Sequence, residues 1–157
     1  MAYTNIEEAI SGKLSASWAL VGDLAVANVH FTTGWYDSKK TEYPQVTVSH
    51  LFPHSDSEIF FGDSSDDDKA YSISREIFGV NVWFRVPAGE SVGDNIDNIE
   101  RMRAEAYRIF LVDWKTYTVP SGISAVLPRN RGTPLYDTTR QTRMLRVEIE
   151  VQVNIIQ

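Results

Sequence analysis

Leu145 to Ile155 reads Leu-Arg-Val-Glu-Ile-Glu-Val-Gln-Val-Asn-Ile, a strict alternation of apolar and polar residues. Side chains of a β-strand point to opposite faces with a period of two, so this pattern predicts a strand with one apolar face. No helical phase gathers these apolar residues on one side. At about 3.3 Å per residue the strand would be roughly 35 Å long, well beyond the usual length. We therefore expect a sheet that extends along this strand and a layer that covers its apolar face.

Other stretches of the chain supply the partner strands and the covering layer. Gln45–Leu51 and residues 72–86 are rich in β-branched residues and alternate in polarity, which predicts two more strands. Residues 92–113 carry apolar side chains at steps of three and four, which predicts a long amphipathic helix. A shorter helix is expected over residues 6–14. The predicted fold is α+β, a mostly antiparallel sheet with the main helix and the shorter N-terminal helix packed on one face, in a single domain spanning residues 1–157.

The segments between these elements are less regular. Residues 18–29 suit either a buried strand with a bulge or an irregular segment, and residues 53–69 form a polar insert that predicts a hairpin tip or loop. Residues 115–127 suit one or two short strands. Residues 128–142 show no periodicity, and a loop of that length inside a domain is often functional.

The composition of the chain excludes several classes of protein. A formal charge of −6 over 157 residues argues against general nucleic-acid binding and against an anionic membrane surface as partner. The absence of cysteine excludes disulfides, thiolate nucleophiles and cysteine-ligated zinc. No apolar run approaches the roughly 20 residues of a membrane span. Glu7 and Glu8 stand where a signal peptide would carry basic residues, so we expect a soluble, cytoplasmic product.

A search for catalytic or metal-binding motifs gives no candidate. His50 and His54 are four residues apart, but Pro53 lies between them, so they are not the paired helical ligands of a metalloprotease. The acidic residues 66–68 lack the central glycine and the distal glutamate of a calcium loop. No phosphate-binding glycine loop and no Gly-x-Ser-x-Gly is present. We therefore expect no catalytic residue, no cofactor and no metal, although a small enzyme whose site cannot be recognised from sequence stays an alternative.

Aromatic residues provide a first possible contact surface. Trp35, Tyr36 and Tyr43 cluster around a turn and could form a platform for a sugar or a peptide, although core packing is the favoured role for Trp35. Trp83 falls on the polar face of its strand, beside Arg85. An exposed aromatic on such a face predicts a contact surface, and the alternative is that a loop covers it.

The separation of acidic and basic residues along the chain provides a second possible contact surface. Residues 54–69 carry six acidic side chains and one lysine, whereas residues 129–146 carry five arginines and one aspartate. Two oppositely charged regions on one chain favour head-to-tail association, which closes into a ring when the rotation permits. The alternative is that each region is separately solvated. The residues predicted to make subunit contacts are Asp63, Asp66, Asp67, Asp68, Trp83, Arg85, Arg129, Arg131, Arg140 and Arg143.

The order of these elements resembles one family, the tail-terminator (tail-completion) proteins of long-tailed bacteriophages, typified by the phage lambda tail terminator. The resemblance lies in an N-terminal helix, the Pro-led strand Tyr43-Pro44-Gln45-Val46-Thr47-Val48 and a hairpin leading to Val82-Trp83-Phe84-Arg85-Val86-Pro87. A helix and the long terminal strand from Arg146 to Ile155 complete it. The segments 18–36 and 128–142 depart from the family's pattern.

The resemblance implies a non-enzymatic structural protein of the virion, present in the tail or neck and assembled in the host cytoplasm. It implies a homo-oligomeric ring, a hexamer, that caps the tail tube, ends its polymerisation and joins tail to head. The implied partners are the chain itself, the tail tube protein and the head-completion or connector protein, with DNA only as passing cargo in the lumen and no membrane. The alternatives are a monomeric carbohydrate- or peptide-binding module and another neck or tail-tube component.

Overall fold

The computed structural model describes residues 5–41, 44–52, 57–61, 70–86, 92–111, 123–130, 135–137 and 141–156. The described helices and strands follow one another in a simple order along the chain. They are α1 (Ile6–Ser17), the short 3-10 helices η1 (Gly22–Leu24) and η2 (Val26–Asn28), β1 (His30–Thr33), β2 (Gln45–Phe52), β3 (Ser57–Phe61), β4 (Ala70–Arg85), α2 (Val92–Leu111), β5 (Ile123–Asn130), β6 (Leu135–Asp137) and β7 (Thr142–Ile156).

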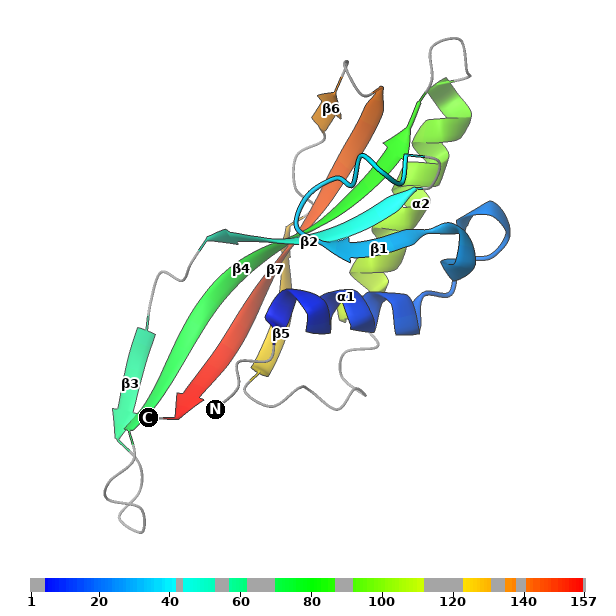
Figure 1. Ribbon diagram of the computed structural model, residues 1–157. Coiled ribbons are helices and arrows are strands. Elements are labelled where there is room, and N and C mark those ends of the chain that lie inside the picture. The colour runs from blue at the N-terminus through cyan, green and yellow to red at the C-terminus, as the bar shows by residue number, and fades with distance from the viewer. Residues whose placement is uncertain are drawn as a thin grey trace.

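The strands form one mixed sheet, so the predicted α+β class is confirmed (Figure 1). Its main path runs β1-β2-β4-β7-β5, while β3 pairs with β4 and β6 pairs with β7. The described pairs are antiparallel except for β1 with β2, which run parallel. Parallel neighbours cannot be joined by a tight hairpin, so the chain between β1 and β2 must cross over the sheet.

The centre of the sheet is the long ribbon made by β4 and β7. The two strands pair from Tyr71 with Ile156 to Arg85 with Thr142 without a register shift. The alternating stretch from Leu145 to Ile155 lies wholly inside β7, so the prediction of a long terminal strand is confirmed. Beyond the helices, the lower part of this ribbon continues together with β3 as an arm that extends away from the rest of the domain (Figure 1).

One buried hydrophobic cluster joins the helices to the sheet. Of the six apolar positions that alternation places on one face of β7, Val147, Ile149 and Val151 have no exposed surface, Leu145 is half-buried, and the side chains of Val153 and Ile155 lie outside the described residues. The three buried residues lie in the same cluster as residues of β2, β4 and both helices, because the residues paired across these strands share one face. The other members with no exposed surface are Ile10, Leu14, Val46, Val48, Val80, Val82, Met102, Ala106 and Ile109.

Polar contacts fix the ends of the helices. The side chain of Asn5 accepts a hydrogen bond from the backbone N–H of Glu8 and caps α1. The buried carboxylate of Glu105 in α2 accepts a hydrogen bond of 2.7 Å from the backbone N–H of Ala19, just beyond α1. Arg108 binds the same carboxylate and also donates to the carbonyl of Ser17. These contacts hold the end of α1 against α2.

Several irregular segments differ from the sequence predictions. Residues 18–29 form the two 3-10 helices instead of a bulged strand, and α1 continues to Ser17 rather than ending at Leu14. Within residues 53–69, expected to be a hairpin tip or loop, residues 57–61 form the strand β3 and pair with the first residues of β4, while residues 53–56 and 62–69 lie outside the described residues. The prediction of a structureless loop over residues 128–142 is wrong where the structure describes them, because β5 reaches Asn130 and β6 pairs with β7; residues 131–134 and 138–140 lie outside the described residues. β5 and β6 form by pairing with β7, and a strand as short as β6 leaves no clear period in the local sequence.

Candidate functional site

A buried polar network lies on the face of the sheet opposite the hydrophobic cluster. Trp83 is only 2% exposed, and its indole N–H donates to the hydroxyl of Thr47 across β2 and β4 at 2.9 Å. The amide of Asn81 donates to the hydroxyl of Ser49 at 3.0 Å. In turn, the Asn81 carbonyl accepts a hydrogen bond of 2.7 Å from Nε of Arg146 on β7. The network therefore ties together the three central strands.

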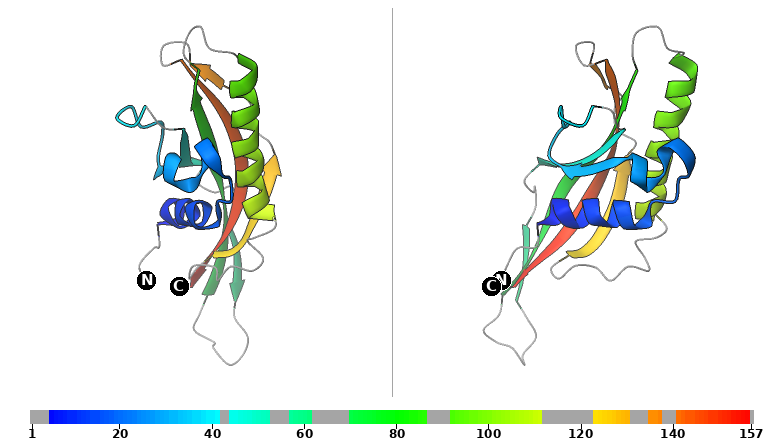
Figure 2. Two further views of the ribbon diagram at one scale, coloured as in Figure 1. Left: turned by 90° about the vertical axis from the view of Figure 1, so that its right-hand side faces the viewer. Right: turned by 45° about the vertical axis from the view of Figure 1, so that its right-hand side comes forward.

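The loop after β1 covers this network. Trp35 stands edge-on to Trp83 with ring centroids 5.0 Å apart, and Tyr36 lies 5.3 Å from the same ring. The side chain of Gln45 holds the loop by donating to the carbonyls of Asp37 and Lys40. The loop lies on the opposite side of the sheet from α2 (Figure 2). The expectation that Trp83 is exposed is therefore wrong, and the alternative, that a loop covers it, is confirmed.

Trp35 itself presents an aromatic face to solvent. The side chain is 47% exposed, so a pure core-packing role for Trp35 is wrong. The guanidinium carbon of Arg146 lies 5.7 Å from the Trp35 ring, and the Arg146 side chain crosses Gly79 to reach it. A Cβ at position 79 would stand 3.1 Å from Nε of Arg146, so the glycine provides the space for this crossing. We call Trp35, Trp83 and Arg146 the Trp35 platform.

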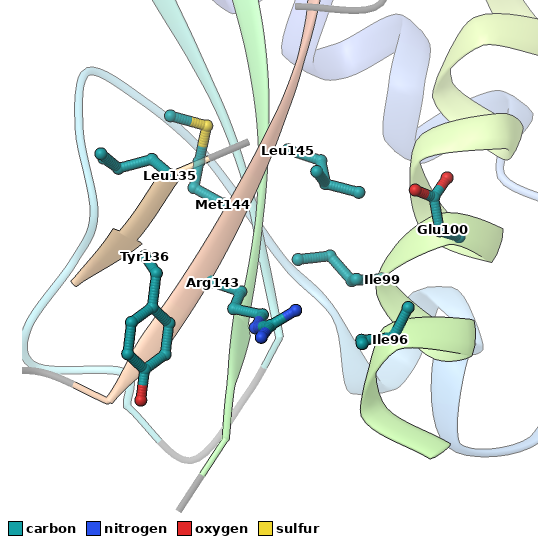
Figure 3. Close-up of a pocket in the computed structure, with 8 residues that line it drawn as sticks. All are labelled: Ile96, Ile99, Glu100, Leu135, Tyr136, Arg143, Met144 and Leu145. Atoms are coloured by element: carbon teal, nitrogen blue, oxygen red, sulfur yellow. The ribbon is translucent and has the colours of Figure 1, made fainter. Parts of the chain in front are cut away.

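A pocket with a volume of about 430 Å³ lies between the first half of α2 and the paired strands β6 and β7 (Figure 3). The two sides of the pocket come from segments far apart in the chain. The residues lining it are Ile96, Ile99 and Glu100 of α2, Leu135 and Tyr136 of β6, and Arg143, Met144 and Leu145 of β7. We call it the Arg143 pocket.

Arg143 is the central polar side chain of this pocket. It reaches from β7 toward α2, and its guanidinium carbon lies 5.5 Å from the centre of the Tyr136 ring (Figure 3). Its Nε is buried and has no hydrogen-bond partner in the part of the chain that the structure describes. Glu100, which also lines the pocket, accepts hydrogen bonds from Arg103 one turn further along α2.

Leu135 and Tyr136 form the exposed wall of the pocket. These two neighbouring side chains are 46% and 50% exposed. An exposed apolar patch beside a charged group is typical of a binding surface. The composition of the pocket therefore suits a partner that brings both apolar side chains and a carboxylate.

The structure separates the residues predicted to make contacts. Arg143 lines the pocket, Arg85 is exposed near the end of β4, and Trp83 is buried. Arg129 lies in β5, but its side chain is outside the described residues, as is the whole of Arg131 and Arg140. The acidic residues Asp63, Asp66, Asp67 and Asp68 also lie outside them.

Within the described residues, no group of three histidine or acidic side chains is arranged to hold a metal ion. His50 stacks on Phe78 and lies 3.9 Å from a carboxylate oxygen of Glu76, while His54 is outside the described residues. None of the described helices has the length and apolar character needed to span a membrane.

Sequence reasoning missed most of the Arg143 pocket. Leu135 and Tyr136 were part of an expected loop, and Ile96 and Ile99 were expected to pack on the sheet. The available signal was the pair of bulky apolar residues in the otherwise polar segment 129–142. No protein-family model matches this chain, and no curated protein matches it either.

Proposed function

We propose that this chain is a structural virion protein, a tail-terminator-like subunit that associates into a ring. The ring would cap the tail tube, end its polymerisation and join tail to head. It would act by shape, with one side matching the tube end and the other preventing further stacking, and without catalysis. The expected stoichiometry is a hexamer, and the further partners are the tail tube protein and the head-completion or connector protein.

The observation that carries the proposal is the shape of the β4–β7 ribbon. The ribbon continues past both helices as an arm with β3, so part of the sheet extends away from the hydrophobic cluster (Figure 1). In the proposed subunit both helices cover one face of the sheet. The arm, which continues past them, is then available to a neighbouring subunit. An arm of a few strands that continues past both helices buries little apolar surface of its own, so a neighbour that covers it would stabilise it.

Native mass spectrometry of the purified full chain tests this proposal. A discrete hexamer, seen as a ring with a central opening by negative-stain electron microscopy, is the expected result. The measurement should cover a range of protein concentrations, because assembly depends on mass action. A protein that stays monomeric at all concentrations, up to the millimolar range, would contradict the proposal.

A second candidate function is a carbohydrate- or peptide-binding module that uses the Trp35 platform. The half-exposed ring of Trp35 is held by the buried Trp83 and by Arg146, and such a rigid aromatic face can stack on a sugar ring. Titration with oligosaccharides, followed by intrinsic fluorescence, tests this function. Binding by a monomer that disappears in Trp35→Ala would favour it over the ring.

A further inference from the structure

The Arg143 pocket contains a buried hydrogen-bond donor without an acceptor among the described residues. Nε of Arg143 is buried without a partner among the described residues, and an unsatisfied buried donor is destabilising. A carboxylate is the best acceptor for a guanidinium, since it forms short, charge-assisted hydrogen bonds. The carboxylate that lines the pocket, Glu100, is already bound to Arg103. A carboxylate from outside the domain would therefore complete the site.

The apolar lining limits what can bring that carboxylate. Ile96, Ile99 and Leu145 line the pocket beside Arg143, and Leu135 and Tyr136 leave a large apolar surface at its edge. A small anion alone would leave this surface in water. A chain segment that carries acidic and bulky apolar side chains close together would satisfy the arginine and cover the apolar wall.

The chain contains one segment of this composition. Residues 56–69 combine six acidic side chains with Ile59-Phe60-Phe61. Of the arginines in residues 129–146, Arg143 lines the pocket, opposite Ile96, Ile99 and Glu100 of α2. Arg143 and the apolar lining of the pocket therefore complement the acidic and the apolar side chains of this segment.

The fold places β3 and the Arg143 pocket toward opposite ends of the β4–β7 ribbon. β3 ends at Phe61 and β4 begins at Ala70, and these two residues pair at the lower end of the arm in Figure 1. The Arg143 pocket lies at the other end, where α2, β6 and β7 begin. Arg143 pairs with Phe84, which is 84 − 70 = 14 residues along β4 from Ala70, or roughly 46 Å at about 3.3 Å per residue. The eight residues between Phe61 and Ala70 are too few to span that distance and return, so they cannot reach the pocket of their own chain. They can reach the pocket of a second copy.

We infer that the Arg143 pocket receives the acidic segment 56–69 of a second copy of this chain. This inference rests on the proposed ring and names its subunit contact. The contact is heterologous, because each copy offers its pocket to one neighbour and its acidic segment to the other. Contacts of that kind close into a ring when the rotation between copies permits.

Charge reversal on the full chain tests the inference. Arg143→Glu places a like charge opposite the acidic segment and should weaken assembly at least about 30-fold in dissociation constant. Replacing Asp63, Asp66, Asp67 and Asp68 together by lysine should weaken it similarly. A chain that carries both sets of changes restores opposite charges between neighbours, so it should assemble again. The assembled mass is measured by native mass spectrometry and sedimentation velocity.

Arg101→Glu is the matched control, because Arg101 is exposed on α2, does not line the pocket and changes the net charge equally. Circular dichroism and the urea midpoint establish that each variant is folded. Assembly of Arg143→Glu at the wild-type concentration would overturn the inference and leave the proposed ring intact, as would a doubly reversed chain that does not reassemble although it folds. A monomeric wild-type protein would instead remove the proposed function, and this contact with it.

Discussion

The middle of β4, residues 78–83, is buried on both faces of the sheet, but by different means. On one face, Val80, Val82 and Val147 have no exposed surface because both helices contribute to the cluster that contains them. On the other, Asn81 is equally buried, but it is surrounded by hydrogen-bonded side chains under a loop. The stability contributed by the apolar face depends on how closely the side chains pack and on how much apolar area they remove from water. The stability contributed by the polar face depends on each hydrogen-bond donor keeping its acceptor. Truncating one side chain there leaves the groups bonded to it without a partner.

The largest effect should come from the apolar face. Ile149→Ala removes a side chain with no exposed surface and leaves a cavity between sheet and helices. The free energy of unfolding should fall by about 3 kcal/mol, measured by urea denaturation. Val26→Ala, at a position 45% exposed, is the control and should change it by less than about 0.5 kcal/mol. Equal effects at the two positions would mean that the cluster is not the main core.

Asn81→Ala should give the next largest effect, now on the polar face. The change removes the acceptor of Arg146 and the donor to Ser49 at a fully buried position. We expect a loss of about 2 kcal/mol in the free energy of unfolding, because the partner groups lose their hydrogen bonds. Asn28→Ala provides the control, since Asn28 is exposed. A loss no greater than that of Asn28→Ala would mean that water replaces the network at little cost.

Ser49→Ala tests a single hydrogen bond of the same network. The hydroxyl accepts from the Asn81 amide at 3.0 Å and is only partly buried, and the amide keeps a longer contact of 3.4 Å to Thr47. We expect a loss of about 1 kcal/mol by urea denaturation. Measuring Ser49→Ala in the Asn81→Ala background gives a double-mutant cycle. Strict additivity in that cycle would show that the two side chains do not act together.

Trp35→Ala should have the smallest effect on stability. The ring is half exposed and its main contact is the edge-on pair with Trp83, which is worth about 0.5–1 kcal/mol. Urea denaturation followed by far-UV circular dichroism measures the change without relying on the deleted fluorophore. A loss above about 2 kcal/mol would indicate that the loop after β1 belongs to the cooperative core. The polar face of the sheet, which this loop covers, would then contribute to the free energy of unfolding by burial, as the apolar face does.

The regular elements could be predicted because their signals are local. The alternation in β7 and the apolar stripe of α2 each lie within one continuous stretch, so the long strand, the main helix and the α+β class followed from the sequence. The parallel pairing of β1 with β2 left no such signal. It depends on a crossover whose covering residues, Trp35 and Tyr36, meet Trp83 only in the folded chain.

The candidate site was predicted less well for the same reason. Charge segregation directed attention to Arg143, but nothing in the local sequence distinguishes it from Arg85, which is exposed near the end of β4. Arg143 becomes a pocket residue because β6 pairs with β7 and brings Tyr136 beside it, while α2 supplies the opposite wall. Contacts between positions about 40 residues apart cannot be read from spacing, because they depend on how the elements pack.

The order of residues along the chain by itself determined three features of this protein. They are the alternation in the terminal strand, the apolar stripe of the main helix and the opposite charges of residues 54–69 and 129–146. The covering of Trp83, the exposure of Trp35 and the opening of the Arg143 pocket were fixed by packing. The physical reason is that periodicity acts between near neighbours, whereas burial depends on which distant surfaces exclude water from one another.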